Sequence, residues 1–466
     1  MLVLKDKTFL KELFKLAFPI ALGNLVSFSI SLSDNMIISK LGEHAASAVF
    51  LGNQVALLLS MLTVGIESAA LVVISRFVGG KENGSARTAA LLAVVFASAL
   101  SLVFFVFSCF FPRIVLSLLT DDFSLVEAGI PFLKTLGVSF LFFAPSQAMA
   151  SVLRSIKKAK LAFFAAFSAF LVNLFFNFVL IFGKIGFSRL DILGAGIATL
   201  IARVTEFLIL FVCVFFVDKR LALRFSAFLN LKKEAAFVFL RNLAPLTATQ
   251  LVWSVNSFFA TSLMGHTGKE VVAGLSVALS LYNLSYVVTA GISGALGIIA
   301  GRFVGSAGCE IKNKISTYSK TAEIIALFLG VLTAVFMQSL KTAFISLWGL
   351  EGAASEWARN FIKVLSVLVI GTAYQSVLLN GIVRSTGNVG FILKLETFCV
   401  FCLIIPMAVF ASIFGASPVM LFAILKCDQV FKCPVAYFKI KKALLKPDLT
   451  SQKRSFRGRS HSTKFR

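Results

Sequence analysis

The chain has 466 residues, of which 58% are hydrophobic and only 14% are charged, and its mean hydropathy is +0.92. A water-soluble protein of this size needs far more polar surface, so the composition excludes a soluble fold. The net charge of +24 is expected in a membrane protein, because such proteins collect Lys and Arg in their cytoplasmic loops, and nucleic acid is therefore not an expected partner.

Long apolar segments recur along the whole chain, and a helix needs roughly 20 such residues to cross a bilayer. The segments lack the alternation of period two that is typical of barrel strands. We therefore predict an all-α, polytopic membrane protein. Its twelve predicted transmembrane helices lie near residues 14–39, 46–75, 88–111, 129–153, 161–183, 193–217, 237–264, 271–301, 320–341, 360–383, 391–413 and 417–438.

Basic residues gather before the first span and between alternate spans. By the positive-inside rule, both termini of this multi-pass protein are then cytoplasmic, and the protein lies in the cell membrane, the inner membrane of a two-membrane cell. We predict an N-terminal six-helix lobe at 1–217, a cytoplasmic linker at 218–236, a C-terminal six-helix lobe at 237–440 and a tail at 441–466. The tail is basic and is expected to be disordered and to contact anionic lipids.

The two halves of the sequence repeat each other. A shift of 226 residues places Pro19 on Pro245 and Arg76-Phe77-Val78-Gly79 on Arg302-Phe303-Val304-Gly305. Two bundles related by an axis along the membrane normal are typical of transporters whose central cavity opens to either side. An inert scaffold is the alternative, but it would not need polar groups inside its spans.

Asp34 is the first candidate for an ion-coupling residue. A carboxyl group in an apolar span is costly unless it is paired or protonated, and the nearest cation in sequence, Lys40, is more than one turn away. Such a group can take up and release a proton, as coupled transport requires. Hydration from outside, close to the helix end, is the alternative interpretation.

Four other polar residues inside the spans are candidates for the same site. Glu67 lies deep in the second span, where the alternative is a structural pair with Arg76 or a polar group of another helix. Asn173 and Asn177 share one face of the fifth span, and Thr199 lies in the sixth. Amides and hydroxyls can hydrogen-bond a carboxyl group, although contacts between helices are the alternative.

Other charges inside the spans are expected to be structural. A spacing of three residues places Arg203 and Glu206 on one helix face, and a spacing of four does the same for Asp428 and Lys432. Glu396 is expected at the membrane interface. No enzyme, cofactor or metal site is predicted, because the histidines lie in loops or the tail and no nucleophile–base motif is present.

Two prolines mark positions where the bundles can bend. Pro19 lies inside the first span, and Pro245 is its counterpart in the seventh. Proline removes a backbone hydrogen bond from a helix, so both are predicted hinges.

Together these residues resemble the multidrug and toxic compound extrusion (MATE) family over about residues 10 to 440. The likeness rests on Pro19 and Asp34, Arg76-Phe77-Val78-Gly79, Arg154, Asn173 and Asn177, Gly194-Ala195-Gly196-Ile197-Ala198-Thr199, Pro245, and Arg302-Phe303-Val304-Gly305. The resemblance implies a V-shaped, twelve-helix antiporter that expels small organic compounds, often cationic and aromatic, in exchange for H⁺ or Na⁺. It also implies that Asp34 binds the coupling ion, with Asn173, Asn177 and Thr199 around it.

The chain departs from the family where some members carry acidic residues. Asn177 stands where some have Asp, and the seventh span has no carboxylate. Coupling is therefore expected in the N-terminal lobe, where Glu67 is not a family residue. We expect a monomer.

Aromatic rings are the expected substrate contacts, and the candidates are Phe163, Phe164, Phe175, Phe176, Phe258 and Phe259. Most of these rings are expected to face lipid, and only a few of the 51 Phe are expected to line the cavity. The alternative function is that of a flippase of the same wider superfamily, which moves lipid-linked oligosaccharides and would need a more cationic central cavity.

Overall fold

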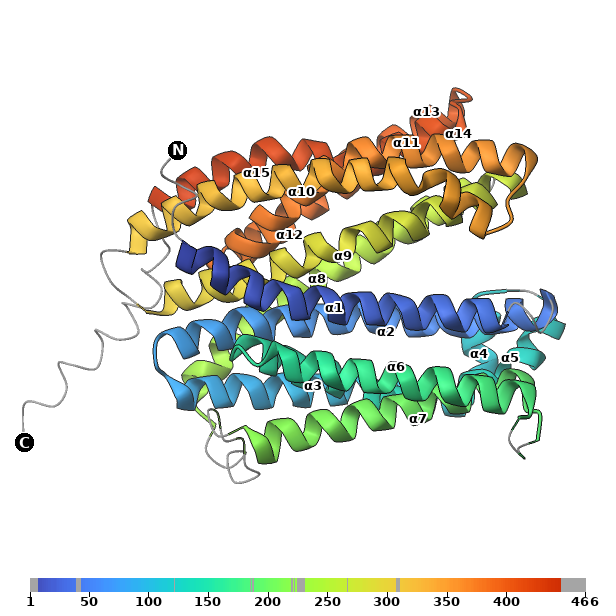
Figure 1. Ribbon diagram of the computed structural model, residues 1–466, viewed down its shortest axis with the longest axis horizontal. Coiled ribbons are helices and arrows are strands. Elements are labelled where there is room, and N and C mark those ends of the chain that lie inside the picture. The colour runs from blue at the N-terminus through green and yellow to red at the C-terminus, as the bar shows by residue number, and fades with distance from the viewer. Residues whose placement is uncertain are drawn as a thin grey trace, which may run out of the picture.

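The computed structural model describes residues 7–38, 43–120, 122–184, 186, 188–218, 221, 223, 231–265, 267–306 and 311–445. Within these ranges every regular element is helical, as predicted (Figure 1). The first half of the chain forms α1 (Lys7–Ile38), α2 (Glu43–Gly79), α3 (Asn83–Phe110), α4 (Pro112–Ser117), α5 (Phe123–Ser155), α6 (Ala159–Phe182), α7 (Asp191–Val212) and η2 (Cys213–Val217). The second half forms α8 (Lys233–Gly265), α9 (Lys269–Gly305), α10 (Ile311–Leu347), α11 (Gly352–Gln375), η4 (Ser376–Val383), α12 (Val389–Phe398), η5 (Cys399–Ile404), α13 (Ile405–Ile413), α14 (Pro418–Lys426) and α15 (Asp428–Leu445).

Among the described residues, 11 helices are long and apolar enough to cross a membrane, which agrees with a polytopic fold. The twelfth predicted span is divided at Cys427 into α14 and α15, so neither part reaches the length of a full span. Several helices also extend beyond the predicted spans, such as α10 and α11, which begin 8 or 9 residues earlier than the apolar segments. The helical backbone continues there because polar side chains at the membrane surface do not interrupt its hydrogen bonds.

Three spans contain π-helical segments that the sequence did not predict, namely η2, η4 and η5. A π-helical turn inserts an extra residue into a helix and thereby shifts the side chains that follow. The η4 segment continues α11 and packs against α9, with Gly381 close to the backbone of Ser293. The shift therefore falls where the tenth span contacts the centre of the molecule.

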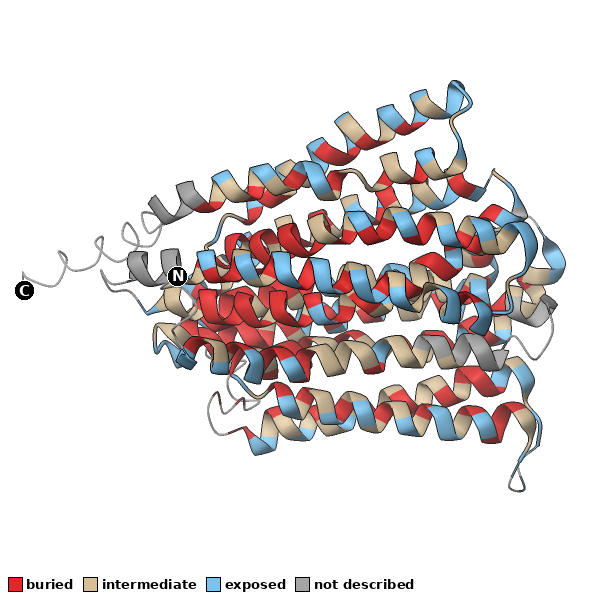
Figure 2. Ribbon diagram, turned by 45° about the horizontal axis from the view of Figure 1, so that its top comes forward, coloured by how far each residue is buried: buried red, intermediate tan, exposed pale blue. Residues whose placement is uncertain are grey.

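Four helices form the centre of the molecule, and the remaining helices flank them on both sides (Figure 1). The central helices are α1, α2, α8 and α9, and the closest contacts between the two halves pair α1 with α9 and α2 with α8. Helices α3, α5, α6 and α7 complete the first half, and the helices from α10 onward complete the second. Figure 2 shows that buried residues concentrate in the central helices, toward the end where the described chain begins.

Small residues on the central helices follow the sequence repeat. A Cβ atom added to Gly65 in α2 would lie 2.7 Å from Cα of Thr247 in α8, and one added to Gly291 in α9 would lie 2.7 Å from Cβ of Ala21 in α1. A shift of 226 residues converts the first contact into the second. The two halves are therefore pseudo-symmetric, and the absence of side chains at these glycines lets the inner helices approach closely.

The repeated Arg-Phe-Val-Gly segments meet at one end of this interface. A Cβ atom on Gly79, the last residue of α2, would overlap the carbonyl oxygen of Arg302. A Cβ atom on Gly305, the last residue of α9, would overlap the carbonyl oxygen of Arg76. Each glycine thus permits backbone contact between the halves at the ends of α2 and α9.

The described part of the predicted linker packs on the first half. Leu221 and Leu223 are buried in the core of that half, and the Asp218 carboxylate contacts Nζ of Lys158 at 2.7 Å. At the other end of the chain, α15 continues to Leu445, and residues 446–466 of the predicted tail lie outside the described residues.

Candidate functional site

A cavity of about 460 Å³ lies among helices of the first half. Residues of α1, α2, α5, α6 and α7 line it, and polar groups face apolar and aromatic ones across it. The polar lining residues are Ser27, Asn53, Gln54, Ser60, Glu67, Ser139, Gln147, Asn173, Thr199 and Arg203. This combination of a mostly apolar wall with a few polar groups is typical of a site for a small organic ligand.

Two of the predicted amides lie side by side in α6. Nδ2 of Asn177 donates a hydrogen bond to Oδ1 of Asn173 at 3.1 Å, and both side chains are buried. Asn173 lines the cavity, whereas Asn177 is not among the lining residues. Nδ2 of Asn173 is buried and has no hydrogen-bond partner within the described part of the chain, so one donor of this cavity-lining side chain is unused.

Thr199 reaches the cavity from α7. Its hydroxyl donates to the carbonyl oxygen of Ala195 at 3.0 Å, which leaves the lone pairs of the oxygen free to accept. The glycines before it position this helix, because a Cβ atom on Gly194 would lie 2.9 Å from the backbone of Leu180 in α6. Gly194 therefore lets α7 pack closely on α6, the helix that carries the asparagines, whereas a Cβ atom on Gly196 would meet Thr135 of α5.

Glu67 lines the cavity from α2 and has a cationic partner. Its Oε2 lies 3.4 Å from Nη1 of Arg154, and its backbone carbonyl accepts a hydrogen bond from Ser151 at 2.8 Å. Both contacts join α2 to α5. The alternative prediction that Glu67 pairs with Arg76 is therefore wrong. The predicted contact with a polar group of another helix is correct, and that group is Arg154.

A second charged pair lies in the cavity wall. Nη1 of Arg203 contacts Oε2 of Glu206 at 2.9 Å, which confirms the pairing predicted from their spacing. Nε2 of Gln147 donates to Oε1 of Glu206 at 3.1 Å, and the Arg203 guanidinium lies 4.6 Å from the centre of the Phe143 ring. The spacing of the pair predicted a structural role only and gave no sign that Arg203 and Gln147 face the cavity.

The rings that line the cavity are Phe50, Phe132, Phe140 and Phe143. None of the six Phe proposed from sequence is among them, and Phe164, Phe175 and Phe258 are more than half exposed. A run of Phe in an apolar helix does not distinguish lipid from cavity, because both surroundings favour apolar rings. Polar neighbours in the same helix do not identify the lining rings either. Phe50 precedes Asn53 and Gln54, but Phe175 and Phe176 stand between Asn173 and Asn177 without lining the cavity.

The other predicted site residues belong to α1 and α8. Asp34 is part of α1, and its side chain lies outside the described residues. Pro19 is buried in α1 and lines a different cavity, close to the start of the chain, and Pro245 lies inside α8. Both helices continue through their prolines.

A separate polar cluster lies in the second half. Nζ of the buried Lys432 contacts Glu396 and Asp428, each at 2.6 Å, which confirms the predicted pair of Asp428 and Lys432. The Glu396 side chain is only 15% exposed and pairs with Lys432, so it packs inside the bundle, and its predicted position at the membrane interface stays a prediction. Gln429 also donates to Asp428 at 2.9 Å. In the described parts of the chain, no group of three or more His, Cys, Asp or Glu residues could hold a metal ion.

Comparison with known proteins gives a consistent result. The family model MatE matches residues 19–179 and 245–410, two segments that begin at Pro19 and at its repeat counterpart Pro245. The chain is 24% identical over 392 residues to the uncharacterized transporter YisQ of Bacillus subtilis, with 83% of each chain covered. It is 23% identical over 385 residues to the probable multidrug resistance protein NorM of Thermotoga maritima, covering 81% of this chain and 80% of that one.

Solved structures share the fold at lower sequence identity. A MOP superfamily transporter from Pyrococcus furiosus matches with a TM-score of 0.83 at 19% identity, over 94% of this chain and 96% of that chain. The MATE transporter VcmN of Vibrio cholerae in its bent form matches with a TM-score of 0.82 at 20% identity, over 94% of this chain and 98% of that chain.

Proposed function

The chain belongs to the MatE family of multidrug transporters, and we propose that it exports organic compounds in exchange for inward H⁺ or Na⁺. Coupling takes place in the cavity of the first half. The observation that carries this proposal is that the described cations around the cavity are already paired, Arg203 with Glu206 and Arg154 with Glu67.

Asp34 is the proposed coupling residue. Two residues of the same helix, Ser27 and Ile30, line the cavity, and Asp34 follows them by seven and four residues. These spacings repeat one face of an α-helix. The described cations of the cavity already have partners. A carboxyl group on that face can therefore bind a mobile ion instead of a fixed cation.

The surrounding groups suit a carboxyl group that alternates between charged and neutral. The unpartnered Nδ2 of Asn173 can donate to a carboxylate, whereas Oδ1 of the same side chain already accepts from Asn177. Protonation of Asp34 removes the charge that attracts this donor, and α1 can respond by bending at Pro19. We favour H⁺ because protonation alone can fill such a site, while Na⁺ needs several oxygen ligands.

The driving force is sufficient for useful export. One proton that enters down a potential of 100 mV releases about 2.3 kcal/mol, and each tenfold gradient of a neutral compound costs about 1.4 kcal/mol. One-for-one exchange of a monovalent cation for a proton is electroneutral, so only the pH gradient then drives export.

The aromatic wall supports flat, aromatic and often cationic substrates. Its volume lies within the range of about 300–1,000 Å³ that is usual for drug-sized ligands. Phe50, Phe132 and Phe140 offer ring faces for stacking and for contact with an organic cation. Phe143 already contacts the Arg203 guanidinium, so we expect it to contribute less to a cationic ligand.

The alternative is a flippase for lipid-linked oligosaccharides. A polyanionic diphosphate headgroup would require an excess of cations, but the two described charge pairs of the cavity balance each other. This observation favours the exporter. Reverse polarity of the binding pocket has suggested a different function for the Pyrococcus furiosus protein, so the sign of the charge in the pocket is informative in such folds.

The basic loops support cytoplasmic termini. Lys157 pairs with Glu12 near the start of α1, and Lys158 pairs with Asp218 after η2, so the basic α5–α6 connection lies at the same end of the bundle as the start of α1 and the end of η2. The positive-inside rule assigns this end to the cytoplasm. The same rule makes the basic tail a proposed contact for anionic lipids of that leaflet.

Transport into proteoliposomes tests the function. The full-length protein is reconstituted, and movement of ethidium, an aromatic cation, is followed under an imposed pH gradient or an imposed Na⁺ gradient. We expect coupled movement under the pH gradient and at least a tenfold loss in Asp34→Asn. Asp191→Asn is the matched control, because Asp191 is exposed and pairs with Arg189 outside the cavity. Unchanged coupling in Asp34→Asn would refute the role of Asp34, and no ethidium movement under either gradient would favour the flippase.

A further inference from the structure

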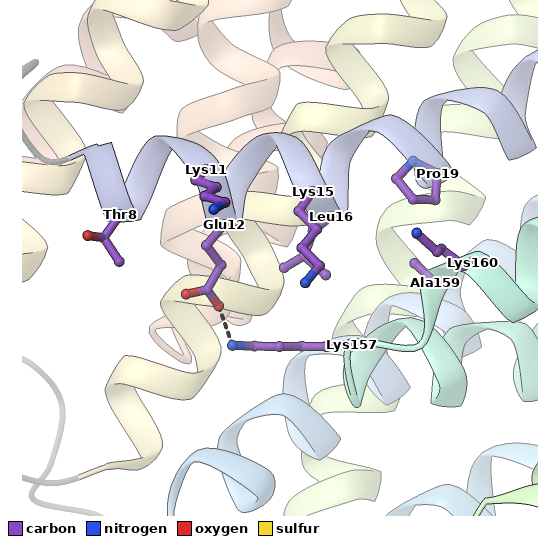
Figure 3. Close-up of a pocket in the computed structure, with 9 residues that line it drawn as sticks. All are labelled: Thr8, Lys11, Glu12, Lys15, Leu16, Pro19, Lys157, Ala159 and Lys160. Atoms are coloured by element: carbon purple, nitrogen blue, oxygen red, sulfur yellow. Dashed lines mark ion pairs between the residues drawn. The ribbon is translucent and has the colours of Figure 1, made fainter.

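A second cavity, of about 360 Å³, opens between the first turns of α1 and the start of α6 (Figure 3). Four lysines line it: Lys11 and Lys15 from α1, and Lys157 and Lys160 from the segment where α6 begins. The single carboxylate in the lining, Glu12, forms an ion pair with Lys157, as the dashed line in Figure 3 shows. Four lysines and one glutamate give the lining a formal charge of +3.

The remaining three lysines have no carboxylate within ion-pair distance in the described part of the chain. All three are exposed, and Figure 3 shows Lys11, Lys15 and Lys160 grouped around the opening between the two helices. The floor is apolar and buried, since it consists of Leu16, Pro19 and Ala159. The cavity therefore joins a cationic rim to a hydrophobic base.

The same two helices continue from this cavity with exposed aromatic rings. On α1, Lys11, Phe14, Lys15 and Phe18 follow one another at the spacing of a single helix face, and the two rings are 54% and 65% exposed. On α6, Lys160, Phe163, Phe164 and Phe167 repeat this arrangement, and Phe164 is 58% exposed. Each helix thus presents lysine at its end and phenylalanine one to two turns deeper.

We propose that this cavity binds the phosphate headgroup of an anionic membrane lipid, whose acyl chains lie along the exposed rings of α1 and α6. The three free ammonium groups attract the phosphate, and the apolar floor accommodates the glycerol region. A soluble anion would gain from the lysines but not from the adjoining rings. A zwitterionic headgroup carries its own cation and gains less from a lining of charge +3.

The location of the cavity predicts that a bound lipid affects the position of α1. A lipid that contacts Lys15 and Lys160 together holds the first turns of α1 against α6, next to Pro19. This consequence rests on the proposed role of α1 in coupling, whereas lipid binding itself does not. Binding is therefore measured separately from transport.

The binding test uses the full-length protein in nanodiscs of phosphatidylcholine, with or without phosphatidylglycerol, and a fluorescent phosphatidylglycerol as the probe. Replacing two lysines, in Lys15→Gln with Lys160→Gln, should weaken binding of the probe by about 30-fold, from the usual contribution of basic residues near a membrane surface. The matched control is Lys81→Gln with Lys233→Gln, which removes the same charge from two exposed lysines outside the cavity. Lys15→Arg with Lys160→Arg keeps the charge and should retain binding, which distinguishes loss of the site from misfolding.

Each outcome decides the proposal. Equal weakening in the control variant would show that general surface charge, not the cavity, attracts the lipid, and would overturn it. If inorganic phosphate or glycerol phosphate displaced the fluorescent lipid at a concentration equal to that of the lipid, the cavity would be a site for a soluble anion instead. Intact lipid binding together with failed ethidium transport would leave the lipid site standing and reject the proposed function alone.

Discussion

Arg76 donates two hydrogen bonds to the backbone carbonyl oxygen of Ser385, from Nε at 2.9 Å and from Nη2 at 2.8 Å. Arg302, its repeat counterpart, donates from Nη2 to the carbonyl oxygen of Ser155 at 2.7 Å. Each arginine ends a central helix of one half and contacts the end of a long span in the other half. These two interhalf arginine contacts close the molecule at the same end as the lysine-lined cavity.

Removing both interhalf arginine contacts should open that end. In the double variant Arg76→Ala with Arg302→Ala, two buried carbonyl groups lose their hydrogen-bond donors. Each unsatisfied carbonyl group should lower the stability of the folded protein by about 1–3 kcal/mol. We expect a larger and broader distance between spin labels placed on the ends of α2 and α9, measured by electron paramagnetic resonance. Arg241→Ala is the control, because Arg241 lies exposed on α8. An unchanged distance distribution in the double variant would argue against a closing role.

Alanine at the contact glycines should destabilise the structure. In Gly79→Ala and Gly305→Ala the new methyl group overlaps backbone of the opposite half, so the halves must separate or the helix ends must shift, at about 1–3 kcal/mol. Gly23→Ala provides the comparison in an open part of α1, where an added Cβ meets nothing within 4 Å and alanine should stabilise the helix by about 0.5–1 kcal/mol. Thermal unfolding in detergent measures both. Equal melting temperatures in the three variants would contradict the close approach.

Lys432→Met should be strongly destabilising. The change leaves Glu396 and Asp428 buried without their cation, and breaking a buried pair in this way costs about 3–5 kcal/mol. Adding Glu396→Gln and Asp428→Asn should restore most of the lost stability, because the cluster is then neutral. Thermal unfolding is again the measurement, with Lys363→Met on the exposed side of α11 as the control. Failure of the neutral triple variant to recover would show that the cluster has a role beyond charge balance.

Two threonines of α7 allow a matched test of the cavity. The hydroxyl groups of Thr199 and Thr205 both donate to the carbonyl oxygen four residues earlier, at 3.0 and 2.8 Å, but only Thr199 lines the cavity. Valine at either position should change stability by a similar amount, about 0.5–1.5 kcal/mol. Ion-coupled ethidium transport should fall several-fold in Thr199→Val and stay near wild type in Thr205→Val. Equal transport in both variants would remove Thr199 from the proposed site.

Patterns within one helix were predictable from sequence. Apolar length predicted the helices and the membrane, and spacings of three and four residues predicted the contacts of Arg203 with Glu206 and Asp428 with Lys432. These predictions hold because helical geometry alone fixes which side chains of one helix are neighbours. The roles of Asp34 in coupling and of Pro19 and Pro245 as hinges stay predictions.

Contacts between helices were not predictable in the same way. Sequence did not identify Arg154 as the partner of Glu67, Lys432 as the partner of Glu396, or the four phenylalanines of the cavity wall. Helix periodicity does not define the rotation of one helix against the next, and lipid and cavity favour the same apolar rings. The helical membrane fold and its internal repeat could therefore be predicted from the amino-acid sequence, since both follow from hydrophobicity and from the order of residues along one chain. Which charges meet and which faces enclose a cavity depends instead on how distant helices pack, and that information is not local in the sequence.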